Sequence, residues 1–122
     1  MRKTVNYKEL IVWQKSMDLA VRVFEVTKKF PKEELYGIVS QMRRAAYSTP
    51  SNIAEGYCRG RKREYKQFLQ IAYASAAELE TQLIISYRTK ILPSDDFKSL
   101  NSLLTEVLKM LNKMILSLKN AV

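Results

Sequence analysis

The chain has 122 residues, of which 47% are hydrophobic, and a formal net charge of +9. This length accommodates one domain with a hydrophobic core and is too short for two ordinary domains, so we treat residues 1–122 as one domain. The positive charge is suited to a polyanionic partner, although it does not determine the fold.

The residues needed for most catalytic and metal chemistry are scarce. The sequence contains no histidine and one cysteine, Cys58. Histidine is the commonest general base and metal ligand, and a single thiol forms neither a zinc site nor an intramolecular disulfide. The glycines between residues 56 and 62 lack the spacing of a phosphate-binding loop. We therefore expect a protein that is not an enzyme, with no cofactor and no metal.

Membrane insertion and export are also unexpected. The four residues from Leu10 to Trp13 form one of the longest apolar runs, whereas a bilayer-spanning helix needs about 20 apolar residues. The basic N-terminus is not followed by the apolar segment of a signal peptide. With a single cysteine, the composition fits a reducing compartment and predicts a cytoplasmic protein.

The first half of the chain predicts two helices. The first helix is expected over about residues 7–29, with Asn6 as its cap and Glu9 completing a capping-box pattern. Pro31 disfavours helix at the residue before it and favours the start of another. The second helix is therefore expected over about residues 33–57.

The second half predicts two more helices. Pro50 lies inside the second helix, and we expect a bend there because proline lacks an N–H and clashes with the carbonyl four residues earlier. Gly60 marks the helix end, and the third helix follows over about residues 61–90. Ser94 is a suitable cap for a fourth helix over about residues 95–119.

Short connections between these helices favour antiparallel neighbours, so the fold class is all-α, an up-down-up-down four-helix bundle. The first helix carries two apolar stripes about 130° apart, more than one bundle core easily covers. We therefore expect a homo-oligomer; the alternative is a wide core face with a few exposed valines. The stripes are Leu10, Trp13, Met17, Ala20, Val21 and Phe24, and Val12, Leu19, Val23, Val26 and Phe30.

Positive charge is concentrated in residues 35–66, which carry seven basic and two acidic residues. Like charges four residues apart on a helix repel each other, and phosphate groups relieve such repulsion. The alternative is an ordinary solvated charged surface. The candidate nucleic-acid-binding residues are Arg59, Arg61, Lys62, Arg63 and Lys66.

Other residues near this segment receive separate interpretations. Arg43 and Arg44 lie in the middle of the second helix, so we expect them to be structural, with ion-pair partners among Glu55, Glu78 and Glu80. Two tyrosines, Tyr57 and Tyr65, flank the basic segment and are suited to stacking on unpaired bases.

Five segments carry a family resemblance: VWQKSMDLA (12–20), FPKEELYG (30–37), SQMRRAA (40–46), TPSNIAEGY (49–57) and AELETQ (77–82). Together they resemble the four-helix-bundle family associated with 23S rRNA intervening sequences. The resemblance extends from about Tyr7 to Lys119 and implies an antiparallel bundle that assembles as a homopentamer. The implied fold is also similar to that of the accessory protein of diversity-generating retroelements, a basic pentamer that binds a reverse transcriptase and nucleic acid.

The residues and the resemblance together lead to two functional hypotheses. The first is a non-catalytic homo-oligomer, expected to be a pentamer, that binds the RNA or DNA backbone through its basic segment. The alternative is a scaffold that docks a nucleic-acid enzyme, such as a reverse transcriptase, without itself contacting nucleic acid. A basic helix lying on anionic lipid is a weaker interpretation, because the bundle core uses the apolar helix faces.

Overall fold

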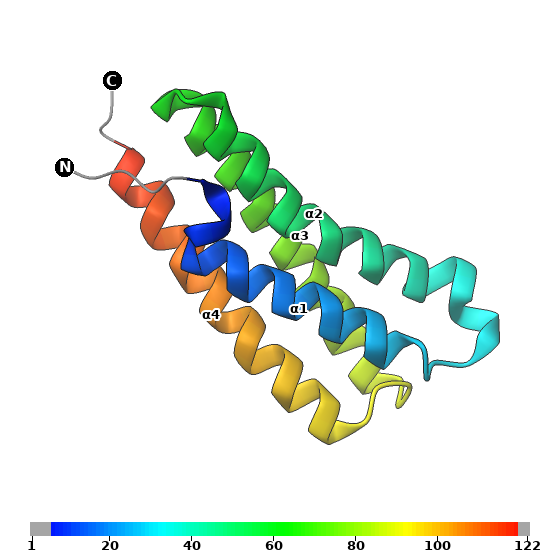
Figure 1. Ribbon diagram of the computed structural model, residues 1–122. Helices are drawn as coiled ribbons and strands as arrows, with labels where there is room; N and C mark the ends of the chain where they lie inside the picture. Colours follow the sequence, from blue (N-terminus) through cyan, green and yellow to red (C-terminus); the bar gives the residue numbers. More distant parts are fainter. Residues whose placement is uncertain (1–5, 120–122) are drawn as a thin grey trace.

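The computed structural model describes residues 6–119, which form four α-helices packed side by side with no strand (Figure 1). The all-α expectation is confirmed. The helices are α1 (Ile11–Thr27), α2 (Ser40–Arg59), α3 (Lys62–Arg88) and α4 (Ser94–Leu118). Each helix packs against the next along the chain, and α1 also packs against α4. Going around the bundle, the α1–α2 pair therefore lies opposite the α3–α4 pair.

The core is apolar and receives side chains from all four helices. One of the two predicted stripes of α1 faces it, including Val12, Leu19 and Val23, each at most 2% exposed. In the other stripe, Met17 and Val21 remain 38% and 53% exposed. The stripe with Met17 and Val21 contributes only in part to the core, through the buried Ala20 and through Leu10 and Trp13, which pack against the core.

The chain enters α1 later than the sequence pattern predicted. Asn6 caps a short 3₁₀ turn (Tyr7–Glu9), and its side chain accepts a hydrogen bond from the Lys8 N–H at 2.8 Å. The expected capping box would use the N–H one residue further on. Leu10 is extended, and α1 starts after it, so the predicted helix over 7–29 is a turn followed by a helix that ends at Thr27.

The predicted start of the second helix, near residue 33, is also wrong. A 3₁₀ turn (Lys32–Glu34) and a π-helical turn (Leu35–Val39) precede α2. Gly37 lies outside helical geometry, with φ −110° and ψ −111°. Proline 31 does open this region, as expected, but the glycine divides what the sequence pattern presents as one continuous helix.

Near its middle, α2 accommodates Pro50 without ending. The predicted bend at this position stays a prediction. The helix runs two residues further than expected, to Arg59, and Gly60 closes it with a left-handed φ of 78°. Glycine adopts this conformation without the steric penalty that a Cβ imposes.

The connection between α3 and α4 is one residue longer than expected, because it comprises residues 89–93 instead of 91–94. The third helix begins at Lys62 and ends at Arg88, two residues before the predicted end, and Lys90 has a positive φ of 66°. The fourth helix begins at Ser94 itself, and its N-cap, Pro93, makes no side-chain cap bond. The interpretation of Ser94 as a cap is therefore wrong, and α4 ends at Leu118 instead of residue 119.

The helices α2 and α3 pack closely at Gly56. Gly56 is buried at this contact, and a Cβ added there would lie 2.6 Å from the Cβ of Phe68. That distance is shorter than any ordinary contact, so the two helices approach each other here only because residue 56 has no side chain. This close approach sets the position at which α2 ends and the chain turns into α3.

Candidate nucleic-acid interface

The five predicted binding residues lie at a sharp reversal of the chain between α2 and α3. Arg59 ends α2, Gly60 is left-handed, and Arg61 is extended with φ −117° and ψ 134° before α3 starts. The reversal is the green turn at the tip of the bundle, at the end where the described chain begins and ends (Figure 1). The structure thus brings all five basic residues to one small region.

Arg59 differs from the other four because acidic residues neutralise it. Its guanidinium forms an ion pair with Glu55 at 2.9 Å, one helical turn earlier, and a second with Glu64 at 3.7 Å. It also lies over the ring of Phe68, 5.1 Å from the centroid. The expectation that Arg59 lacks a local counter-charge is therefore wrong, and this arginine joins the two helices at the turn.

The other four residues, which we call the turn cations, are Arg61, Lys62, Arg63 and Lys66. The first three are exposed and Lys66 is half-buried. Within residues 6–119, none of the four has a carboxylate within ion-pair distance. The two acids nearest in sequence, Glu55 and Glu64, are held by Arg59. The turn therefore presents four positive charges that no neighbouring acid of the described chain offsets.

The two flanking tyrosines pack against each other. The rings of Tyr57 and Tyr65 meet edge to face, with centroids 5.8 Å apart. Burial, and to a smaller extent the neighbouring Tyr57, raises the pKa of Tyr65 to about 12, so its phenol is neutral at physiological pH. Its hydroxyl is buried with no hydrogen-bond partner in the described chain. Tyr65 is thus a packing residue, and the prediction that both rings are free to stack on bases is wrong for it.

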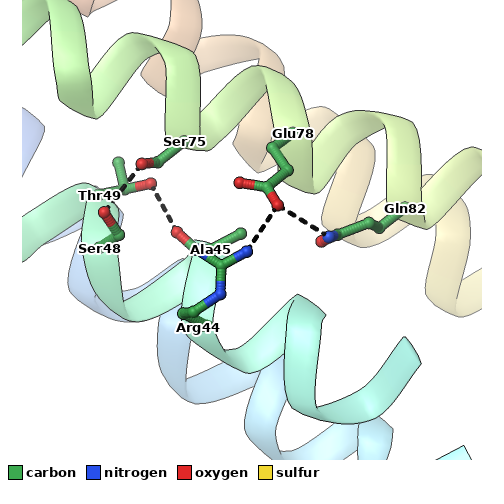
Figure 2. Close-up of polar contacts among 7 residues, drawn as sticks. All are labelled: Arg44, Ala45, Ser48, Thr49, Ser75, Glu78 and Gln82. Atoms are coloured by element: carbon green, nitrogen blue, oxygen red, sulfur yellow. Dashed lines mark hydrogen bonds and ion pairs between the residues drawn. The ribbon is translucent and has the colours of Figure 1, made fainter. Parts of the chain in front are cut away.

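The predicted ion pair is confirmed for Arg44 and is wrong for Arg43, whose structural contacts within residues 6–119 are with Thr27 and Phe24. Arg44 Nη2 lies 2.8 Å from Glu78 Oε2 on α3 (Figure 2). Arg43 turns the other way, donates to Thr27 Oγ1 at 2.9 Å, and lies over the ring of Phe24 at 4.3 Å. The two arginines therefore connect α2 to α3 and to α1, respectively.

A polar seam continues between α2 and α3 beside these contacts. The hydroxyls of Ser48 on α2 and Ser75 on α3 are 2.8 Å apart, whereas the neighbouring Thr49 donates within α2 to the carbonyl of Ala45 at 3.1 Å (Figure 2). Small side chains let the helices approach, and short hydroxyl groups find partners within that narrow space. This seam holds α2 and α3 in register and so fixes the geometry of the turn that joins them.

A second surface, on the opposite side of the bundle from α3 and α4, is apolar. It is a groove of about 440 Å³ between α1 and α2, with walls that include Met17, Val21 and Phe24 from α1 and Tyr47 and Pro50 from α2. The stripe of the first helix that contains Met17, Val21 and Phe24 indicated one wall from the sequence alone. Tyr47 and Pro50 were missed, because their alignment with that stripe depends on how α2 packs.

Other kinds of site find no support in the described part of the chain. No group of three metal-ligating side chains of the histidine, cysteine, aspartate or glutamate type occurs among residues 6–119. Within the same range, no helix combines the length and the apolar composition needed to cross a membrane. Cys58 is exposed beside the turn.

The fold and the basic turn define a class: a small, basic four-helix protein. A family model described as "23S rRNA-intervening sequence protein" matches residues 8–113. The chain belongs to this family, as its sequence motifs led us to expect. No curated protein matches the chain significantly.

A solved structure agrees with this assignment. The chain is similar to a protein of unknown function from the S23 ribosomal protein family of Bacteroides thetaiotaomicron, with 28% sequence identity and a TM-score of 0.80. The similarity covers 86% of this chain and 95% of that one. The helical fold is therefore shared across nearly the whole length of the two chains.

Proposed function

We propose that this protein binds the phosphate backbone of nucleic acid, without catalysis, through the turn cations Arg61, Lys62, Arg63 and Lys66. One observation carries the proposal: these four charges lie together at the tip of the bundle, and no acid of the described chain lies within ion-pair distance of them. Uncompensated charge on so small a region favours a polyanion, because phosphate contacts release condensed counterions.

The local packing supports a rigid binding surface. The left-handed Gly60 and the close approach at Gly56 fix the angle between the two helices. Arg59, with its two carboxylate partners, holds the base of the turn from inside. The turn cations therefore project from a support that does not have to be ordered when a ligand binds, which lowers the entropic cost of binding.

A binding titration with charge reversal tests this proposal. We expect the unmodified protein to bind fluorescein-labelled rRNA fragments and mixed-sequence DNA at low salt, and the variant R61E/K62E/R63E/K66E to lose this binding, measured by fluorescence anisotropy. All four positions are at the surface, so the variant should keep its helical circular dichroism. An unmodified protein that binds none of these probes contradicts the proposal, and unchanged binding by the folded variant rejects the site.

We further propose that the protein is a homo-oligomer, with five subunits as the expected number, and that the apolar α1–α2 groove is one of its contact surfaces. Val21 is 53% exposed on α1, and the groove beside it is lined by Met17, Phe24, Tyr47 and Pro50. Apolar surfaces of this kind on long helices are commonly covered by another chain. The turn cations stay free in such an assembly, because they lie on other elements.

Light scattering on a size-exclusion column tests the assembly. We expect a mass close to five times the 14.2 kDa of one chain, and dissociation when Val21→Glu places a charge in the apolar groove. Asp18→Asn is the matched control, because Asp18 is exposed on the same helix but lies beside α4. A single-chain mass for the unmodified protein contradicts the proposal, as does a Val21→Glu variant that keeps the full assembly.

A further inference from the structure

The acidic residues of α3 and α4 that form ion pairs are all turned toward other helices. Glu78 pairs with Arg44 of α2, and Glu106 of α4 pairs with Lys15 of α1 at 3.1 Å. Glu64, at the start of α3, pairs with Arg59 of α2. These three carboxylates therefore neutralise basic residues of α2 and α1. The remaining acid of α3, Glu80, forms no ion pair within residues 6–119 and lies about two helical turns before Tyr87, on the side of α3 that faces α4.

Two lysines, Lys62 of α3 and Lys119 after α4, lie on the sides where these two helices face each other. Tyr87 of α3 stacks on Phe97 of α4 with ring centroids 4.5 Å apart, which marks the side on which each helix faces the other. Lys62 precedes Tyr87 by about seven helical turns, and Lys119 follows Phe97 by about six. Because whole turns separate them, both lysines lie on these facing sides. Since the helices are antiparallel, both lie at the end of the bundle that carries the α2–α3 turn.

Lys66 of α3 and Lys109 of α4 extend this group of basic residues along the two helices. Lys66 follows Lys62 by about one turn on α3. On α4, Lys109 lies two residues from each of the buried Val107 and Leu111, about 200° around the helix, and is therefore directed away from the core. Both Lys109 and Lys119 are exposed. From residue 107 to the end of the described chain, α4 contains basic residues and no acidic ones.

We propose that the nucleic-acid contact extends from the turn onto α4, so that Lys109 and Lys119 bind backbone phosphates together with Lys62 and Lys66. We call these four residues the α3–α4 surface. The inference rests on the proposed function and adds two binding residues that are distant in sequence from the basic segment. It requires a polyanion long enough to contact two neighbouring helices, whose axes are typically 8–10 Å apart.

The α3–α4 surface is compatible with the proposed assembly. The apolar groove belongs to α1 and α2, which form the opposite side of the bundle. A subunit that covers this groove leaves Lys109 and Lys119 exposed to solvent. Oligomerisation through the groove and phosphate binding through the α3–α4 surface can therefore occur on the same molecule.

The test compares two neutralised variants, K109Q/K119Q and K29Q/K32Q. Each removes two charges from exposed lysines, so the net charge changes equally, but Lys29 and Lys32 belong to the connection between α1 and α2. This connection lies at the other end of the bundle from the α2–α3 turn (Figure 1). The probe is a labelled mixed-sequence DNA duplex of about 25 base pairs, titrated at several salt concentrations. Each phosphate contact contributes about 0.9 to the slope of log K against log salt.

We expect K109Q/K119Q to lower the salt slope by about 2 and to weaken binding roughly 10- to 100-fold at about 0.1 M salt. K29Q/K32Q should leave the slope unchanged, and K109R/K119R should bind like the unmodified protein. If K109Q/K119Q binds with an unchanged slope while R61E/K62E/R63E/K66E does not bind, the inference is overturned and the proposed function stands. If the unmodified protein does not bind the duplex, both are wrong.

Discussion

The seam between α2 and α3 and the turn that joins these helices both contain arginines, but the two sets of arginines differ in their acidic partners. In the seam, Arg44 reaches Glu78, and the hydroxyls of Ser48 and Ser75 meet each other. At the turn, Arg61 and Arg63 have no acid of the described chain within ion-pair distance. The difference shows that basic density alone does not identify a binding residue. The position of the acids decides which arginines hold the fold together and which are free for a ligand.

The largest expected effect on stability is at the seam. Gly56→Ala places a Cβ 2.6 Å from the Cβ of Phe68, so α2 and α3 must separate. We expect the free energy of unfolding to fall by about 2–3 kcal/mol, the upper range for overpacking a core. Urea denaturation followed by circular dichroism measures this change. An unaffected or more stable variant would contradict the role of Gly56 as a close contact between α2 and α3.

A smaller effect is expected at the turn. Gly60→Ala meets no neighbouring atom within 4 Å, but it forces a Cβ into a backbone with φ 78°. The cost is the left-handed strain alone, about 1 kcal/mol. The same denaturation experiment should rank Gly60→Asn closer to the unmodified protein than Gly60→Ala, since asparagine tolerates this conformation better. The opposite ranking would mean that strain does not determine the cost at this position.

The ion pair across the seam should contribute less again. The side chains of Arg44 and Glu78 are 65% and 40% exposed, and exposed pairs typically contribute below about 1 kcal/mol. A double-mutant cycle with Arg44→Gln and Glu78→Gln should give a coupling energy near 0.5 kcal/mol. If Arg44 served the ligand instead, Arg44→Gln would lower the salt slope of nucleic-acid binding by about 1; we expect no such change.

The smallest effect at neutral pH is expected for Tyr65→Phe. The phenol has a raised pKa of about 12 and a buried hydroxyl without a hydrogen-bond partner in the described residues. Removing that hydroxyl should leave stability at pH 7 unchanged or slightly higher, because no hydrogen bond is lost. The packing of the ring against the end of α2 is retained by phenylalanine.

The same variant should reveal a dependence on alkaline pH. Below pH 10 the Tyr65 phenol is protonated in both the folded and the unfolded state, so it contributes no pH dependence. Between pH 10 and about 12 the unfolded chain releases this proton and the folded chain keeps it, so the stability of the unmodified protein falls as pH rises. Thermal melts across this range should show a shallower fall for Tyr65→Phe. Parallel curves for the two proteins would be inconsistent with a buried phenol.

The sequence predicted the helices well because long apolar periodicity and few breakers leave little ambiguity. The sequence did not predict helix boundaries where the local backbone geometry interrupts a helix. Gly37 divides the segment before α2, and no apolar pattern reports that change of backbone. The periodicity of helix one showed two stripes, but only packing reveals that Val12 and Val23 face the core while Met17 and Val21 line an open groove.

The sequence predicted that the candidate site lies in the basic segment, but it did not predict which basic residues pair with acids or which residues outside the segment lie near it. Arg59 has Glu55 one turn before it, and this spacing is a pairing signal that the sequence already contains. The second partner, Glu64, comes from across the turn and depends on how Gly60 redirects the chain. Lys119 was not a candidate, because its place beside the start of α3 follows from the antiparallel packing of α3 and α4.

The salt dependence of nucleic-acid binding tests the central claim most directly. The test compares R61Q/K62Q/R63Q/K66Q with K28Q/K29Q/K32Q/K90Q, which removes the same number of charges from exposed lysines in the α1–α2 and α3–α4 connections. These connections lie at the opposite end of the bundle from the α2–α3 turn (Figure 1). With a DNA duplex as the probe, the account predicts that the first variant lowers the slope of log K against log salt by about 3.6 and the second leaves it near that of the unmodified protein. Equal losses in the two variants would show that net charge, and not the turn, drives binding, and would contradict the account.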